Sequence, residues 1–230
     1  MNLRHQFICK RLALAGFLCL TLASQTAIAS DSGTPLPPAR AGGLSQLERI
    51  PLAKLLQQPQ LDTGKGSLRA PAAAPIMPQR LAQSLPIPAA QQREVEQAYS
   101  QLLSIYRQAM RQGGLPDDDI GVALGAFIVA NYQVASDSSI DDEVSKAAYR
   151  QMQQLLAAEP SLQKLDGAHR QALFEELAIM AMTMETIFEQ GERAALERAQ
   201  PAARQYLQAV LQRPYNALRF TADGMTLAER

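Results

Sequence analysis

Residues 120–133, IGVALGAFIVANYQ, decide the fold of this chain. The run is apolar nearly all round a helix, and a helix without a polar face is typical of the buried centre of a bundle. Gly121 and Gly125 lie four residues apart on one face, so we expect a neighbouring helix to approach closely there. Three aspartates at 117–119 precede the run, and we expect them in the first turn of a helix that begins near Pro116. They are adjacent rather than alternate, which favours capping of the helix over a calcium loop.

Helical periodicity continues on both sides of this stretch. It predicts helices over residues 91–112, 166–190 and 194–212, and another that starts after Ser138 or Ser139 and ends before Pro160. Pro201 either kinks the last helix or starts a new one. The tail, residues 217–230, forms a short helix or a small hairpin. We therefore predict an all-α fold, a single bundle of about five helices over residues 91–230.

The segment before the bundle has a different composition. Ten of the 14 prolines lie between residues 35 and 88, and no aromatic residue occurs between Phe17 and Tyr99. Little area can be buried without large side chains, so residues 30–90 are predicted to be a disordered Pro/Ala/Gln-rich linker. The leucines of residues 44–56 have the spacing of one helical face, although Pro51 interrupts the pattern. They either dock in a partner's groove or form a short turn on their own domain, and we favour the turn.

Residues 1–29 have the three parts of a secretory signal peptide. Basic residues at 4, 10 and 11 come first, an apolar run follows over 12–22, and Ala27-Ile28-Ala29 gives a small-x-small site with cleavage expected before Ser30. The apolar run is too short to span a bilayer, and we expect no transmembrane segment in the remaining chain. These features predict an exported protein, periplasmic or secreted.

The composition restricts the chemistry that residues 30–230 can perform. They contain no cysteine and no tryptophan, one histidine (His169), and a formal net charge of −3. So weak a charge argues against nucleic acid as a partner, because a binding face needs a basic stripe. A single histidine also leaves no second imidazole for a zinc site, so we expect His169 at the surface or its boundary.

Two constellations could still carry function. Met180, Met182 and Met184 offer soft thioethers to copper(I), but Met182 points nearly opposite the other two on a helix, which favours core packing. Glu175, Glu176 and Glu185 could supply paired carboxylates for an envelope hydrolase. Solvated helix faces explain all three acids, so we assign no catalytic, cofactor-binding or metal-binding residue.

Three segments carry a family resemblance: LPDDDIGVALGAFIVANYQ, YRQMQQLL and LFEELAIMAM. Over residues 93–225 the chain resembles an uncharacterised domain-of-unknown-function family of exported, all-helical bacterial proteins. The resemblance implies the fold and the compartment, and it brings no catalytic or ligand residue.

Taken together, these observations lead to a hypothesis of function. We expect an exported, non-enzymatic helical domain that binds another protein in the cell envelope, as a toxin inhibitor or an assembly adaptor. The candidate surfaces are the exposed sides of the helices at 91–112 and 194–212, or residues 44–56. The alternatives are a hydrolase that uses the helix-borne carboxylates, and weak copper(I) binding.

Overall fold

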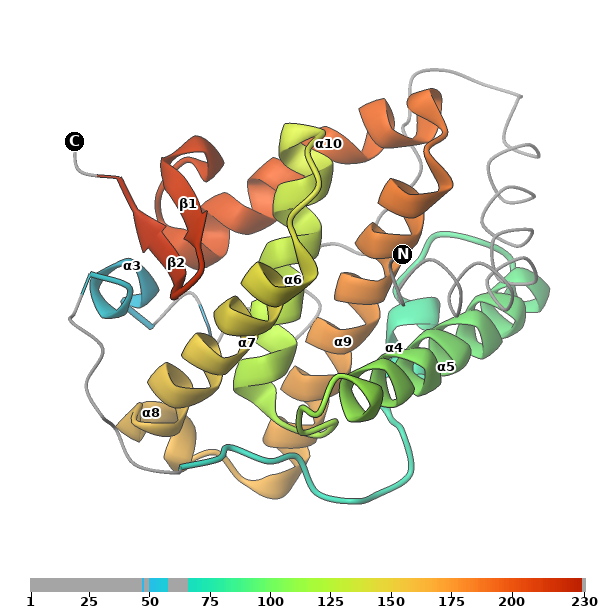
Figure 1. Cartoon of the computed structure of the whole chain (residues 1–230). Helices are drawn as coiled ribbons and strands as arrows, with labels where there is room; N and C mark the ends of the chain where they lie inside the picture. The colour runs from blue at the N-terminus through green and yellow to red at the C-terminus, as the bar shows by residue number, and fades with distance from the viewer. Residues whose placement is uncertain (1–46, 48–49, 58–65, 229–230) are drawn as a thin grey trace.

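The computed structural model describes residues 47, 50–57 and 66–228, which form a helical bundle with one small β-hairpin (Figure 1). The elements in these residues are α3 (Leu52–Leu55), α4 (Met77–Gln83), α5 (Ala89–Gln112), α6 (Ile120–Ser136), α7 (Asp142–Ala157), α8 (Pro160–Gln163), α9 (Gly167–Gln190), α10 (Arg193–Leu211), a 3-10 turn (Tyr215–Ala217), β1 (Leu218–Thr221) and β2 (Gly224–Leu227). The predicted all-α fold is confirmed, and its five helices are the long ones, α5, α6, α7, α9 and α10. The short helices α3, α4 and α8 were not predicted.

Helix α6 is the centre of the bundle, as its apolar sequence predicts. It packs against α7, α9 and α10 (Figure 1), and all of its residues except Tyr132 and Ser136 are buried. The helix begins at Ile120, so only Asp119 of the three aspartates is its N-cap, and the other two precede it. The buried side chains of the whole domain join into one continuous core.

The two glycines of α6 allow a close helix crossing, as predicted. A Cβ atom placed at Gly121 would lie 2.5 Å from the Cα atom of Gln153, and one at Gly125 would lie 2.8 Å from the Cα atom of Tyr149. Both obstacles are backbone atoms of α7, which cannot move aside as a flexible side chain can. Glycine is therefore required at these positions to bring α6 and α7 into contact.

The ends of the helices carry local signals. Helix α7 is capped by Asp141, which accepts from the backbone N–H of Glu143, rather than by either predicted serine. Asp166 caps α9, and Gly191 ends it with a φ of 65°. Helix α10 continues through Pro201, so no new helix starts there.

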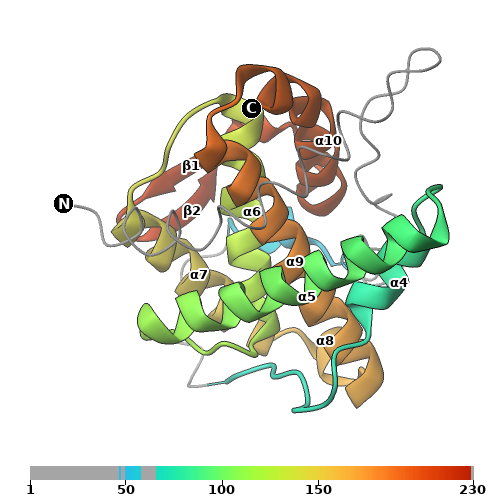
Figure 2. The same ribbon diagram turned by 90° about the vertical axis from the view of Figure 1, so that its right-hand side faces the viewer.

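Aromatic pairs mark the contacts between the outer helices and the centre. Helix α5 crosses α9 (Figure 2), where the rings of Tyr106 and Phe174 meet edge to face with centroids 5.8 Å apart. On α10, Tyr206 packs near Phe127 of α6 with centroids 6.1 Å apart. No described helix is long and apolar enough to cross a membrane.

The C-terminal tail is a hairpin, which decides between the two predicted alternatives. Strands β1 and β2 pair antiparallel, and the turn returns the chain through Gly224, whose φ is 121°. The hairpin packs on α7. There the side-chain amide of Gln151 donates to the carbonyl of Met225 at 2.8 Å and accepts from its N–H at 2.6 Å.

The segment that precedes α5 packs on the bundle over residues 66–88, which we call the strap. The composition of these residues predicts a disordered linker, whereas Leu68, Met77, Leu81 and Leu85 are all buried in the core. The strap runs extended along the start of α9 and then forms α4 against α5 and α9 (Figure 1). The predicted signal peptide, residues 1–29, lies outside the described residues. Of the predicted linker before residue 66, the structure describes only residues 47 and 50–57.

Candidate functional site

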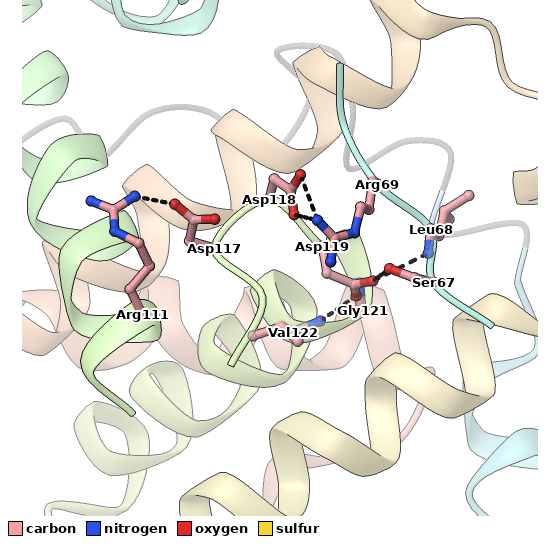
Figure 3. A network of polar contacts seen from close by, with 9 residues as sticks. All are labelled: Ser67, Leu68, Arg69, Arg111, Asp117, Asp118, Asp119, Gly121 and Val122. Atoms are coloured by element: carbon pink, nitrogen blue, oxygen red, sulfur yellow. Dashed lines mark hydrogen bonds and ion pairs between the residues drawn. The ribbon is translucent and has the colours of Figure 1, made fainter. Parts of the chain in front are cut away.

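A polar network joins the strap to the start of α6, and Asp119 is at its centre (Figure 3). One oxygen of this fully buried carboxylate accepts from the backbone N–H groups of Gly121 and Val122 at 2.9 and 3.1 Å. The other oxygen accepts from the hydroxyl of Ser67 at 2.6 Å and from the N–H of Leu68 at 3.2 Å. Asp119 therefore caps α6 and holds the strap with the same group.

The other two aspartates of this loop pair with arginines (Figure 3). Asp118 lies 3.3 Å from a guanidinium nitrogen of Arg69 in the strap, and Asp117 pairs with Arg111 at the end of α5. Among the residues that the structure describes, no three His, Cys, Asp or Glu side chains are placed to hold a metal ion. The three aspartates act as a cap and as two ion-pair partners.

A second buried carboxylate, Glu175 of α9, holds the strap further along. One of its oxygens accepts from the N–H groups of Ile76 and Met77, each at 2.8 Å, and the other accepts from the side chain of Gln171 at 2.8 Å. Helix α4 begins at Met77, and Ile76 before it has no side chain that could cap it. Glu175 therefore acts as the cap of α4 from about a hundred residues away in sequence.

The remaining acids of α9 are also buried, so the prediction that solvated faces explain all three acids is wrong. Glu176 is fully buried, and Glu185 accepts from the side-chain amide of Gln133 at 2.9 Å. Burial, and to a lesser extent the nearby charge of Glu176, raises the pKa of the Tyr206 hydroxyl to about 12. An acid inside an apolar run such as LFEELAIMAM is the sequence signal for such burial, because a buried charge needs a partner.

The three methionines of α9 lie in the core. Met180 and Met184 are almost fully buried, and Met182, on the opposite side of the helix, is 6 % exposed. A helix surrounded by other helices on two sides buries both faces, which is why opposite residues can share one core. The geometry fits packing rather than three thioethers that converge on one ion.

His169 is exposed at the first turn of α9, at the surface as expected. Its ring nitrogen Nδ1 lies 2.8 Å from a carboxylate oxygen of Asp166, the N-cap of the helix. The backbone N–H of His169, and then its ring, lower the pKa of Asp166. The contact is local and belongs to the helix cap.

The candidate docking segment at 44–56 is turned inward where it is described. Leu47, Ile50, Leu52 and Leu56 are buried, which supports a turn on its own domain, while Leu44 lies outside the described residues. The outer sides of α5 and α10 remain exposed and polar. Of the candidate surfaces, these two helix faces are the ones that stay exposed.

The architecture defines a class of protein: a small helical domain with a C-terminal hairpin. In this domain, buried acidic side chains accept hydrogen bonds from the domain's own backbone. The chain belongs to DUF6683, a family of unknown function, whose model matches residues 40–228. The match confirms membership in an uncharacterised family, and it extends further toward the N-terminus than the resemblance did, so that it includes the strap. The curated proteins and the solved structures gave no match.

Proposed function

We propose that this chain is an exported, non-enzymatic helical protein that binds another protein in the cell envelope. The strongest support comes from the acidic side chains that could act in catalysis, because they accept hydrogen bonds from groups within the fold. Asp119 and Glu175 accept hydrogen bonds from backbone N–H groups, and Glu185 accepts from the amide of Gln133. Groups committed to the fold in this way are poorly placed to exchange protons with a substrate.

The hydrolase alternative has less support. Glycoside cleavage needs two carboxylates on opposite sides of the scissile bond, separated by roughly 5–10 Å and open to the sugar. Glu175 and Glu176 are neighbours on one helix, so their side chains diverge by about 100° around its axis. Both are fully buried, so a substrate could reach neither one without moving the packed helices.

The surface proposed for the partner is the outer side of α5 or of α10. Both helices place their apolar residues against the bundle and their glutamines and charges outward. A toxin inhibitor or an assembly adaptor would use such a rigid, polar helix face without changing its own fold. Residues 50–57 are a weaker candidate because their leucines are largely occupied by the core.

Site-specific photo-crosslinking in the native envelope tests this proposal. A photoreactive residue would replace exposed Gln101 on α5 or Gln205 on α10, with exposed Arg150 on α7 as the matched control. We expect one adduct of constant mass from α5 or α10, competed away by excess unlabelled protein, and none from α7. No competable adduct from either helix would overturn the proposal.

Export is tested separately by fractionation and N-terminal sequencing. We expect the protein outside the cytoplasm with Ser30 as its first residue. A full-length chain confined to the cytoplasm would contradict export without bearing on the helix-face proposal.

A further inference from the structure

The C-terminal hairpin, at the periphery of the molecule (Figure 1), has two edges, and their outward backbone groups are satisfied differently. The N–H of Ala228 donates to the carbonyl of Ala217 at 2.8 Å, so in this register alternate residues from Arg219 onward bond to β2. Leu218 and Phe220 therefore direct their N–H and carbonyl groups away from β2, toward the outer edge of β1.

Of these two residues, Phe220 keeps its pair of backbone groups open. Leu218 is satisfied locally, because its N–H donates to the carbonyl of Tyr215 and its carbonyl accepts from the guanidinium group of Arg219 at 2.9 Å. The opposite edge of the hairpin is closed by the side-chain amide of Gln151. In the part of the chain that the structure describes, no group bonds to the N–H or the carbonyl of Phe220. An added strand pairs with a sheet through an N–H and a carbonyl of this kind.

Three aromatic rings form a continuous cluster next to this open pair. The ring of Phe220 packs on that of Tyr132 with centroids 4.8 Å apart, and Tyr132 packs on Tyr215 with centroids 6.5 Å apart. All three side chains are partly exposed. The guanidinium carbon of Arg204 lies 5.2 Å from the centre of the Tyr215 ring. Aromatic residues and arginine are the types enriched at protein interfaces and among the residues that contribute most to binding.

The charge beside the aromatic cluster is positive. Arg204 and Arg219 are both exposed, and neither forms an ion pair with a described carboxylate. Each donates to backbone carbonyl oxygens instead, those of Ala135 for Arg204 and of Asn216 and Leu218 for Arg219. A bound segment with acidic side chains would complement these two charges.

We propose that the edge of β1 at Phe220 binds an extended, acidic segment of a partner protein as an added strand. The backbone pair of Phe220 holds the strand, the aromatic cluster packs on its apolar side chains, and Arg204 and Arg219 pair with its acids. The open backbone pair favours a peptide over an anionic lipid surface, which has no strand backbone to pair with it. The inference goes beyond the proposed function, because it concerns the hairpin edge and names the chemistry of the bound segment.

Selection from a display library of random linear peptides on the purified full chain tests the proposal. We expect the enriched peptides to alternate acidic and apolar residues, because successive side chains of a strand point to opposite faces. The most enriched peptide should protect the amide of Phe220 from hydrogen exchange, whereas the amide of Arg219, already paired with β2, should be protected with or without it. No enrichment, enrichment of peptides without acids, or an unprotected Phe220 amide in the complex would overturn the proposal.

Variants link the enriched peptide to this surface. Arg204→Gln and Arg219→Gln should each weaken its binding about fivefold or more, while Arg93→Gln, at an exposed arginine of α5, should leave it unchanged. N-methylation of the peptide at the residue that pairs with Phe220 should also abolish binding, which covers the case of a protein variant that does not fold. Equal affinities in all folded variants would contradict the proposal. Arginine-dependent binding to phosphatidylglycerol vesicles, without any enriched peptide, would identify a lipid surface instead and overturn it.

Discussion

The strap and the C-terminal hairpin both flank the bundle, and each is held by side chains that bind its backbone. The strap is held by two carboxylates: Asp119 accepts from the N–H of Leu68, and Glu175 accepts from those of Ile76 and Met77. The hairpin is held by the amide of a single glutamine, which binds both the N–H and the carbonyl of Met225.

The difference follows from what each backbone offers. The start of a helix such as α4 presents only free N–H donors. A carboxylate suits this position because it only accepts hydrogen bonds. The open edge of a strand presents an N–H and a carbonyl from the same residue. A side-chain amide suits this position because it both donates and accepts hydrogen bonds. Substitutions at the carboxylate contacts and at the glutamine contact should therefore differ in the loss of unfolding free energy. They should also differ in which segment, the strap or the hairpin, detaches from the bundle.

Asp119→Ala should have the largest effect. It removes one acceptor that serves four donors, and each buried donor left unsatisfied costs roughly 1–3 kcal/mol. We expect a loss of about 3–5 kcal/mol in the free energy of unfolding, measured in urea. Asp118→Ala is the matched control and should cost about 0–1 kcal/mol, because its contact with Arg69 is largely exposed. Equal losses in the two variants would contradict the role of Asp119.

Glu175→Ala should be the next in size, at about 2–4 kcal/mol, because it leaves two buried N–H groups and the amide of Gln171 without their acceptor. The loss should concentrate in the strap, so trypsin should cut faster after Arg69 and Arg80. Glu94→Ala, at an exposed position of α5, should change neither stability nor cleavage. Unchanged cleavage in the Glu175 variant would show that another contact holds the strap.

Substitutions at the hairpin should cost less. Gln151→Ala leaves the N–H and carbonyl of Met225 unsatisfied, and we expect about 1–3 kcal/mol. Gly224→Ala strains a φ of 121° and places a Cβ atom 2.6 Å from the Gln151 oxygen, for about 1–3 kcal/mol. The double variant should lose less than the sum, because both changes break one contact. Full additivity would contradict the role of Gln151.

Alkaline pH should have the smallest effect when it is counted per pH unit, and it should act on the bundle rather than on either flank. The pKa of Tyr206 is raised from about 10 to about 12 in the folded state. The folded state therefore keeps a proton that the unfolded state releases. This contribution to stability is complete below pH 10 and is lost between pH 10 and 12, with a slope of up to ~1.4 kcal/mol per pH unit. Urea unfolding across this range should show a shallower slope in Tyr206→Phe, and an unchanged slope would contradict the assignment.

Local patterns were enough to predict the bundle. The apolar run of α6 indicates its burial, the spacing of Gly121 and Gly125 predicts the close approach of α7, and the five long helices follow from periodicity. The cap at Asp119 could also be predicted, because it lies next to the helix that it serves. The sequence of the tail is compatible with a helix or a hairpin, since a turn signal alone does not show what the strands pack against.

The strap could not be predicted in the same way. Its composition, rich in proline and free of aromatic residues, resembles that of a linker, and its acceptors come from distant parts of the chain. Glu175 contacts Met77 across 98 residues, and Asp119 contacts Leu68 across 51. No local pattern encodes such a pairing. The same distance explains why the acids of α9 were interpreted as solvated.

The central claim, that a buried carboxylate fastens the strap to the bundle, is tested most directly by native-state hydrogen exchange. The amides of Ile76 and Met77 should be protected in the unaltered protein and should lose protection about a hundredfold or more in Glu175→Ala. The amide of Met225 in the hairpin should lose far less. Unprotected strap amides in the unaltered protein, or an equal loss of protection in strap and hairpin, would contradict the claim.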